Sequence, residues 1–303
     1  MTCCSIDPNL NLIDLDQDMT GFRKFISAWL YADGELTFVV DPGPSHSIEF
    51  LIKTLKDLNI KKIDYILLTH IHIDHAGGAG RLLEAFPMAE VICHEKGIPH
   101  MVSPQKLWQG SLKVLGKIAE GYGEIIPVPQ EKIRFADKID TPSGIIQVVE
   151  TPGHAIHHFS YLFKDYLFAG EVAGVIHKTE NNLYARPATP PVFKQDISLS
   201  SLETVATLDF EGLCCGHYGY HENPKSILLS ACEQLRLWVD VVKDELKQGE
   251  DGSIQRIIDS LLKKDELFRG VINLDDDIRQ REDYFIKNSI KGMIQFVKEQ
   301  TAS

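Results

Sequence analysis

The chain has 303 residues, enough for one large domain or two modest ones, and 44% of them are hydrophobic, which supports a substantial core. It carries 31 basic and 43 acidic residues, a net charge of -12. This balance argues against a broad cationic surface for phosphates or anionic lipids, so we expect neither nucleic acid nor membrane as a partner. No apolar run approaches the roughly 20 residues of a membrane-spanning helix, and the first residues do not resemble a signal peptide.

The six cysteines indicate the compartment. They include two adjacent pairs, and neighbours in the sequence cannot readily close an ordinary disulfide. No CxxC pair of the kind found in structural zinc sites is present. We therefore expect a reducing, cytoplasmic location. Cys214 and Cys215 lie in an apolar segment and are interpreted as small core residues, not as metal ligands.

Up to residue 223, short β-branched runs alternate with stretches of helical spacing. The runs predict strands at 38–40, 63–68, 91–93, 145–149 and 166–169. Helices are predicted at 47–58 and 80–86, together with one longer helix over 104–120 that we interpret as an insertion bordering a pocket. This order predicts sheets flanked by helices.

After Pro224 the strand signal nearly disappears. Three amphipathic helices are predicted at 225–248, 252–264 and 276–299. We therefore divide the chain into residues 1–223 and a helical extension over 224–303 that forms a lid or the surface of a homodimer. The apolar positions of the last helix predict core contacts with the first part of the chain or with a sister subunit; they are Ile286, Ile290, Met293 and Phe296.

The stretch ILLTHIHIDHAGG at 66–78 places four ligand-capable side chains directly after an apolar run. Alternation along a strand directs His70 and His72 to the same side, with Asp74 and His75 following into a loop. Two glycines at 77 and 78 then allow a tight turn into the next helix. A chance cluster of solvated histidines is the alternative, but such crowding among only 12 histidines favours a metal site.

One motif supplies too few ligands for two complete coordination spheres, so others must come from distant loops. His154 in TPGHAIHH, Glu171 in FAGEVAG and His217 in CCGHYGY each follow a strand signal. Ligands at the ends of several strands can meet at one rim of a sheet sandwich. His157 and His158 are interpreted either as outer hydrogen-bond partners or as surface residues.

These residues resemble the metallo-β-lactamase fold hydrolases. The resemblance rests on the HxHxDH motif at 70–75, on the later ligands in the same order, and on the DPG turn at 41–43. It covers about residues 10 to 222. Segments such as DHAGGAGRLLEAFPMAEVICHEKGIPHM and ARPATPPVF look most similar to glyoxalase II-like (hydroxyacylglutathione hydrolase-like) members. The resemblance implies an α/β fold, a four-layer αββα sandwich of two mixed sheets with the site along one edge.

The resemblance also implies a dinuclear metal site. Position by position, it assigns His70, His72 and His154 to the first metal, Asp74, His75 and His217 to the second, and Glu171 to the bridge. The chain departs from the family pattern at the bridge, because an aspartate usually stands where this chain has Glu171. The extra methylene moves the carboxylate outward by about one bond length, so that Glu171 bridges the metals, binds only one, or widens the pair.

Two divalent ions in such a site would lower the pKa of a bound water and polarise a substrate carbonyl. Zinc is expected first, with iron or manganese as alternatives, because imidazole and carboxylate ligands suit all three. Asp74 is expected to orient the nucleophile and shuttle a proton. We expect a metal-dependent hydrolase of a small thioester, ester or lactone. A ligand-sensing regulatory protein and a diiron redox enzyme are the alternatives, although the diiron reductases usually carry glutamate at the position of His72.

Overall fold

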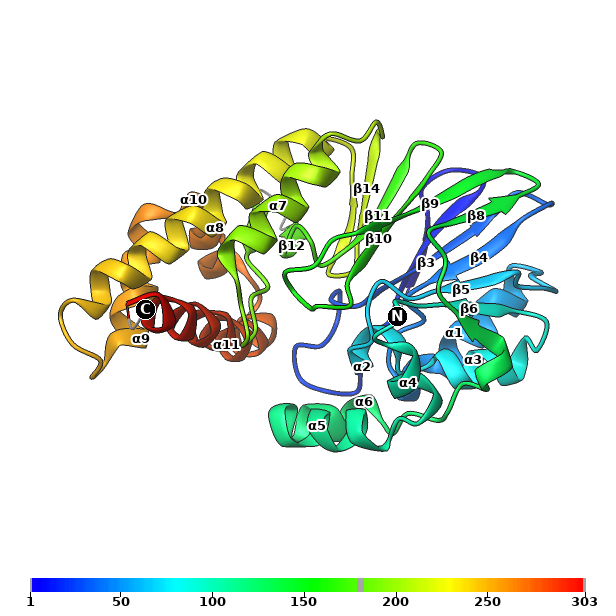
Figure 1. Cartoon of the computed structure of the whole chain (residues 1–303), viewed down its shortest axis with the longest axis horizontal. Helices are drawn as coiled ribbons and strands as arrows, with labels where there is room; N and C mark the ends of the chain where they lie inside the picture. Colours follow the sequence, from blue (N-terminus) through cyan, green and yellow to red (C-terminus); the bar gives the residue numbers. More distant parts are fainter. Residues whose placement is uncertain (1, 179–182, 302–303) are drawn as a thin grey trace.

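The computed structural model describes residues 2–178 and 183–301, and it has four layers, with helices outside two central sheets (Figure 1). The first sheet is antiparallel from β1 to β4 and parallel from β4 to β7. Its strands run in chain order: β1 Thr2–Ser5, β2 Leu10–Asp14, β3 Ser27–Ala32, β4 Thr37–Val40, β5 Tyr65–Leu67, β6 Glu90–Ile92 and β7 Ile133–Arg134.

The second sheet has the order β15-β14-β11-β10-β9-β8 and is antiparallel except between β11 and β14. Both sheets are thus mixed, as expected from the resemblance. The strands are β8 Lys138–Thr141, β9 Gly144–Glu150, β10 Phe159–Phe163, β11 Tyr166–Gly170, β14 Gly212–Cys215 and β15 Gly219–His221, and β12 Val175–Lys178 forms a separate hairpin with β13 Leu183–Arg186.

The helices divide between the two outer faces. Those on the first sheet are α1 Ile48–Asp57, α2 Ile73–Ala76, α3 Ala79–Ala85, α4 Ile98–Val102, α5 Gln105–Leu115 and α6 Lys117–Tyr122. Those on the side of the second sheet are α7 Gln195–Ala206, α8 Pro224–Leu246, α9 Ser253–Lys264, α10 Glu266–Arg269 and α11 Asp276–Thr301. Short 3-10 helices occur at Ser45–Ser47, Gln130–Lys132 and Gly270–Asn273. None of the helices in the described part of the chain is both long and apolar enough to cross a membrane.

Aromatic side chains fill the space between the two sheets. Trp29 and Phe38 from the first sheet meet Phe163 and Phe168 from the second, with several ring pairs packed edge to face. Cys214 is buried in this layer, and Cys215 is buried on the opposite side of its strand, so the prediction that both are core residues is confirmed. This packing fixes the two sheets against each other and therefore fixes the rim where their strands end.

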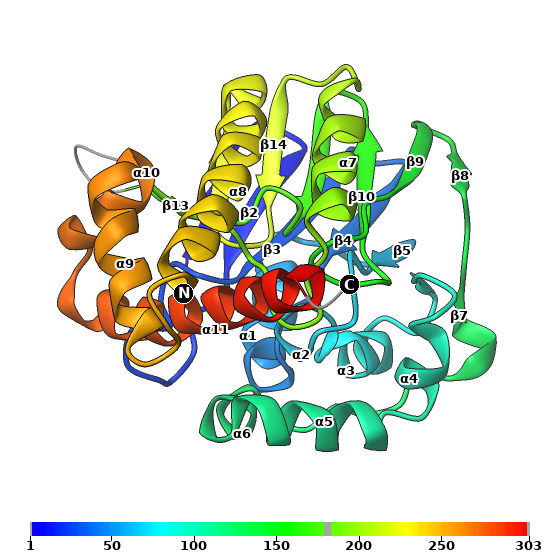
Figure 2. The same cartoon turned by 60° about the vertical axis from the view of Figure 1, so that its left-hand side comes forward.

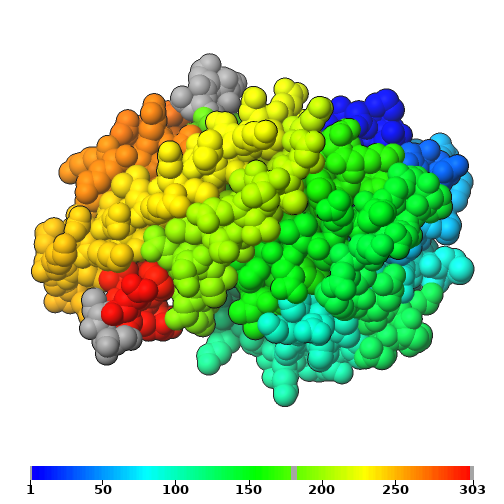
Figure 3. All heavy atoms as spheres, turned by 45° about the horizontal axis from the view of Figure 1, so that its top comes forward, coloured from blue at the N-terminus to red at the C-terminus, as the bar shows by residue number. Residues whose placement is uncertain are grey.

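The helices of the extension pack on α7, on one another and on the β12–β13 hairpin, at the outer side of the second sheet. Trp238 of α8 and Phe268 of α10 belong to the same buried cluster as Leu213 of β14. In the space-filling view, the yellow surface of α8 adjoins the yellow-green surface of α7, which adjoins the green surface of the preceding strands (Figure 3). The predicted core contacts of the last helix are confirmed, since all four positions are buried in this cluster. The division at residue 223 stays a prediction.

The prediction of one helix over 104–120 is wrong. The chain forms α5 and α6 instead, with Gly116 between them at φ +56. Glycine adopts this left-handed backbone without the steric cost that a side chain would bring. Helix α7 and the strands before residue 38 were not predicted from the sequence.

Candidate metal centre

The HxHxDH motif lies where β5 reaches the rim between the sheets. His70 and His72 follow the strand, His72 in extended backbone, and Asp74 and His75 lie in α2. The expectation that these last two follow into a loop is therefore wrong. The expected turn at Gly77 and Gly78 into the next helix is present, and both residues have right-handed backbone angles. Glycine also leaves space at this turn, since a Cβ on Gly77 would lie 2.3 Å from the carbonyl oxygen of Ile73.

The structure brings together all seven side chains predicted as ligands. The first group has ligand atoms within 4.8 Å of one another, and so has the second. The first group is His70, His72, His154 and Glu171, and the second is Asp74, His75 and His217. These sets match the two predicted metal sites, with Glu171 included in the first.

The carboxylate of Glu171 lies between the two groups. Its Oε2 is 2.9 Å from His154 Nε2 and 3.5 Å from His75 Nε2. Its Oε1 is 3.6 Å from His217 Nε2. One carboxylate thus faces histidines of both groups, the position that a bridging ligand requires. The Glu171 backbone N–H donates to His158 Nε2 at 3.0 Å, so His158 holds the start of this loop.

Three histidines have their outer ring nitrogens anchored by acceptors. His217 Nδ1 donates to the carbonyl of Phe25 at 2.9 Å, and His154 Nδ1 donates to that of Ala188 at 3.0 Å. His75 Nδ1 faces Asp41 Oδ2 at 3.0 Å. Because carbonyls and carboxylates only accept, each Nδ1 carries a hydrogen, which leaves the Nε2 lone pair for a metal once Nε2 is deprotonated.

These lone pairs fit metal ions. His75 Nε2 and His217 Nε2 lie only 3.2 Å apart, and two lone pairs at that distance repel unless a cation or proton lies between them. His70 Nε2 is buried and has no hydrogen-bond partner among the described residues. Such an orphaned buried acceptor costs free energy unless something binds it. A set of imidazoles and carboxylates arranged in this way is a donor set for divalent zinc, iron or manganese.

The charges in the site also suit cation binding. Burial holds the pKa of His70 well below its usual value and, with the charge of His154, lowers the pKa of His72 to about 3. Burial alone would raise the pKa of Glu171, but His154 and His217 hold it well below its usual range. An ionised carboxylate and such neutral imidazoles are the protonation states that metal ligation requires. Burial alone would lower the pKa of His75 and of His154, but Asp74 raises that of His75 and Glu171 raises that of His154, so an ion bound there would displace a proton.

Asp41 belongs to the site and was not recognised as more than part of a turn. Its carboxylate accepts from the backbone N–H of Thr69 at 2.8 Å and from the Thr69 hydroxyl at 2.6 Å, in addition to His75. It therefore fixes both the start of the motif and one ligand ring. The signal that could have found it is a buried carboxylate directly after an apolar strand, which needs partners.

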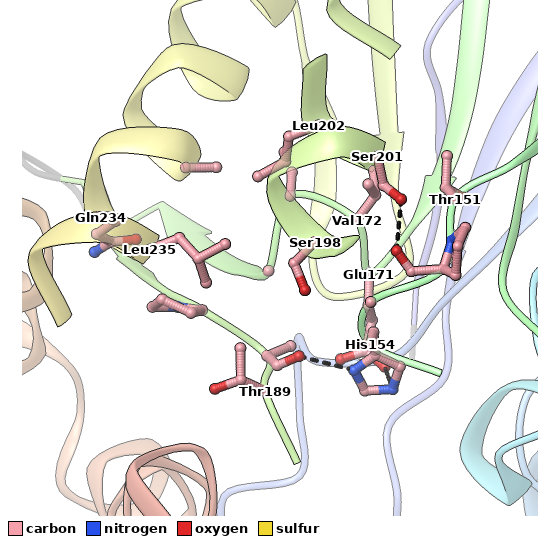
Figure 4. A pocket seen from close by; sticks show the side chains of 17 residues that line it. Thr151, His154, Glu171, Val172, Thr189, Ser198, Ser201, Leu202, Gln234 and Leu235 are labelled. Carbon is pink, nitrogen blue, oxygen red and sulfur yellow. Dashed lines mark hydrogen bonds and ion pairs between the residues drawn. The ribbon is translucent and has the colours of Figure 1, made fainter. Parts of the chain in front are cut away.

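A small cavity lies beside the two groups (Figure 4). His154 and Glu171 lie at one end of it, Ser198 and Ser201 of α7 line one wall, and residues of α8 line the opposite side. Its volume of about 30 Å³ is enough to admit water.

Comparison with known proteins agrees with this geometry. The sequence profile of the Metallo-beta-lactamase superfamily matches residues 21–217. A metallo-beta-lactamase fold-containing protein of Sulfurisphaera tokodaii is 32% identical over 190 residues, which cover 60% of this chain and 68% of that protein. Hydroxyacylglutathione hydrolase 1 of Vibrio vulnificus is 32% identical over 145 residues, which cover 48% of this chain and only 46% of the relative.

Solved structures give the same result for the whole fold. An archaeal metallo-beta-lactamase superfamily protein from Sulfolobus tokodaii superposes with a TM-score of 0.65 at 25% identity. The superposition covers 95% of this chain and 98% of the other. It therefore includes the helices after residue 223 and not only the sandwich.

Proposed function

This chain belongs to the metallo-beta-lactamase superfamily and is a metal-dependent hydrolase, and we propose that it cleaves a small thioester, ester or lactone. The observation that carries the proposal is the Glu171 carboxylate between two groups of ligand atoms. The similarity to hydroxyacylglutathione hydrolase supports a thioester among these three classes. The small-molecule class is also supported by the net charge of -12, which disfavours polyanionic partners.

In this proposal the chain's own residues hold two ions. One group of histidines and Glu171 hold the first ion, and Asp74, His75 and His217 hold the second. When bound, a pair of such ions lowers the pKa of a bound water and polarises a carbonyl. Zinc is our first choice, with iron or manganese as alternatives.

Asp74 is the residue that we assign to proton handling. Burial raises the pKa of its carboxyl, but His75 and His217 together lower it to about 2, so it is ionised at neutral pH. Its side chain is 15% exposed, and its Oδ2 lies 3.5 Å from His217 Nε2. An ionised carboxylate that reaches both solvent and a ligand ring can orient a nucleophile and accept its proton.

The test is metal analysis joined to turnover. Full-length protein purified without chelator should contain about two divalent ions per chain and should hydrolyse members of a panel of thioesters, esters and lactones. Glu171→Gln should lose at least one ion and about 100-fold in turnover. The substitution removes the negative charge of a ligand, which weakens both metal binding and catalysis. Glu84→Gln on the exposed face of α3 is the matched control and should behave like the wild type.

Other outcomes would favour the alternatives. Two irons with electron transfer to oxygen and no hydrolysis would favour a diiron redox enzyme. Metal binding without turnover of any substrate in the panel would favour a ligand-sensing protein. Either result would contradict the proposed hydrolysis of a small thioester, ester or lactone.

The cellular compartment and the role of the C-terminal helices are also proposals. We place the protein in a reducing, cytoplasmic compartment, which the six free cysteines support. The role of the helices after residue 223 as a lid or as a homodimer surface stays a prediction, and light scattering of the full-length protein would give the oligomeric state.

A further inference from the structure

We propose that α11 positions one ligand ring in each of the two metal sites, so that retention of both ions depends on this one helix. The inference rests on the ligand set proposed above. It concerns the two backbone carbonyls that accept from His154 and His217. The carbonyls belong to segments far apart in the sequence, at 187–189 and 21–25 respectively. Both segments lie against α11.

The first contact leads to His217. Arg281 Nη1 donates to the carbonyl of Gly21 at 2.8 Å, and the guanidinium lies 4.0 Å from the centre of the Phe25 ring. The Phe25 ring is in turn stacked on the His217 ring, with centroids 4.1 Å apart and planes at 14°. Since the Phe25 carbonyl also accepts from His217 Nδ1, Arg281 holds the residue that sets both the tilt and the tautomer of this ligand.

The fit at this end is close. A Cβ on Gly21 would lie 2.1 Å from the carbonyl oxygen of Asp277 in α11. Arg23 adds ion pairs to Asp275 and Asp277. The segment that carries Phe25 therefore cannot shift without moving the start of the helix.

The second contact leads to His154. Ser289 Oγ donates to the carbonyl of Pro187 at 3.0 Å, and the Thr189 hydroxyl donates to the carbonyl of Ser289 at 3.2 Å. Ala188 lies between these two anchors, and its carbonyl accepts from His154 Nδ1. A Cβ on Gly292 would lie 2.1 Å from the Thr189 carbonyl oxygen, so helix and loop touch backbone to backbone.

The two anchors lie on one rigid element. Arg281 and Ser289 are two turns apart, about 12 Å along the axis. Figure 2 shows α11 as one unbroken helix running across the lower end of α8, on which it packs. Its interior face is buried at Ile286, Ile290 and Met293. A displacement of this helix would thus disturb both carbonyl anchors together.

The effect should appear in metal retention. Loss of an outer hydrogen-bond partner of a ligating histidine typically weakens metal binding about 10-fold to 100-fold. Arg281→Met should therefore weaken retention of the ion held by His217, and Ser289→Ala should weaken retention of the ion held by His154. Each positioning variant should affect mainly one ion, because the anchors are separate.

The measurement is the transfer of zinc from the full-length, loaded protein to a chromophoric chelator of increasing concentration. His217→Ala and His154→Ala provide the signature for loss of each ion. Lys287→Met, on the exposed side of the same helix, is the control and should retain zinc like the wild type. Arg281→Lys should restore part of the retention, since it keeps the cation over the Phe25 ring.

The outcomes separate this inference from the proposed function. Wild-type retention in both Arg281→Met and Ser289→Ala, alongside metal loss in the two histidine variants, would overturn the role of α11. Unchanged zinc content in the histidine variants would instead overturn the ligand set. If Arg281→Met fails to fold, Ser289→Ala decides the question, because it removes only one hydroxyl group.

Discussion

Replacing His70 with alanine is expected to abolish hydrolysis while the protein stays folded. His70 Nε2 is the buried acceptor without a partner among the described residues, and it faces Glu171 Oε2 at 3.4 Å. Loss of the ion that it helps to hold would remove several kcal/mol of charge stabilisation from the reaction. A loss of about 4 kcal/mol corresponds to about 1000-fold in kcat/KM. Steady-state turnover together with bound-metal analysis would measure the effect.

His100→Ala is the matched control for this variant. His100 is exposed on α4, and its removal should leave turnover and metal content unchanged. Circular dichroism of both variants should match the wild type. Turnover near the wild-type level in His70→Ala would show that hydrolysis does not depend on the proposed first site.

Replacing Glu282 with alanine is expected to destabilise the fold more than any exposed substitution. Glu282 is fully buried in α11, where Oε2 accepts from Arg186 Nε at 2.5 Å and from the Tyr184 hydroxyl at 2.8 Å. Oε1 accepts from Arg281 Nε at 3.1 Å. The substitution would leave two buried guanidinium groups without their carboxylate. Removing one partner of a buried ion pair costs about 3–5 kcal/mol, which urea denaturation would measure.

The neighbouring residue provides the control. Asp283 is exposed and forms an ion pair with Lys287 one turn away. Pairs of this kind contribute about 0.3–0.5 kcal/mol, so Asp283→Ala should change the free energy of unfolding by less than about 1 kcal/mol. Equal effects of the two substitutions would contradict the special role of the buried carboxylate.

Glu282 also makes stability depend on pH. Burial raises the pKa of this carboxyl, but Arg186 and Arg281 outweigh burial and lower it from 4.5 to about 2. A pKa that is lower in the folded state stabilises the protein fully above the unfolded value and progressively less as pH falls toward the folded one. The contribution should thus be lost between about pH 4.5 and pH 2, and Glu282→Ala should show a weaker dependence in that range.

The parts of the site that were predicted from the sequence share one property. The motif places four metal-binding side chains at close spacing: His70, His72, Asp74 and His75. Such a local pattern can be recognised without knowledge of the tertiary structure. His154, Glu171 and His217 were found because each follows a strand signal. Their convergence was implied by the resemblance and is now described by distances.

The parts that were missed depend on tertiary structure. The anchors of His154 and His217 are backbone carbonyls of Ala188 and Phe25. Every residue has a carbonyl, so no side-chain type marks them, and only the packed loops decide which one faces a ring. The break between α5 and α6 at Gly116 was not predicted either. A glycine inside a helical pattern can be tolerated or can end the helix, and the sequence alone does not decide between the two.

The shared cluster of the second sheet and the outer helices limits how the chain can be shortened. The part that matches the superfamily profile ends at residue 217, yet Leu213 and Leu167 pack in one cluster with Trp238 and Phe268. A chain cut after residue 223 would expose to water the apolar side chains that these helices cover, and exposed patches of this kind promote aggregation. The recognisable family segment is thus not a minimal enzyme, and transplanting it into a fusion protein would require the helices that follow.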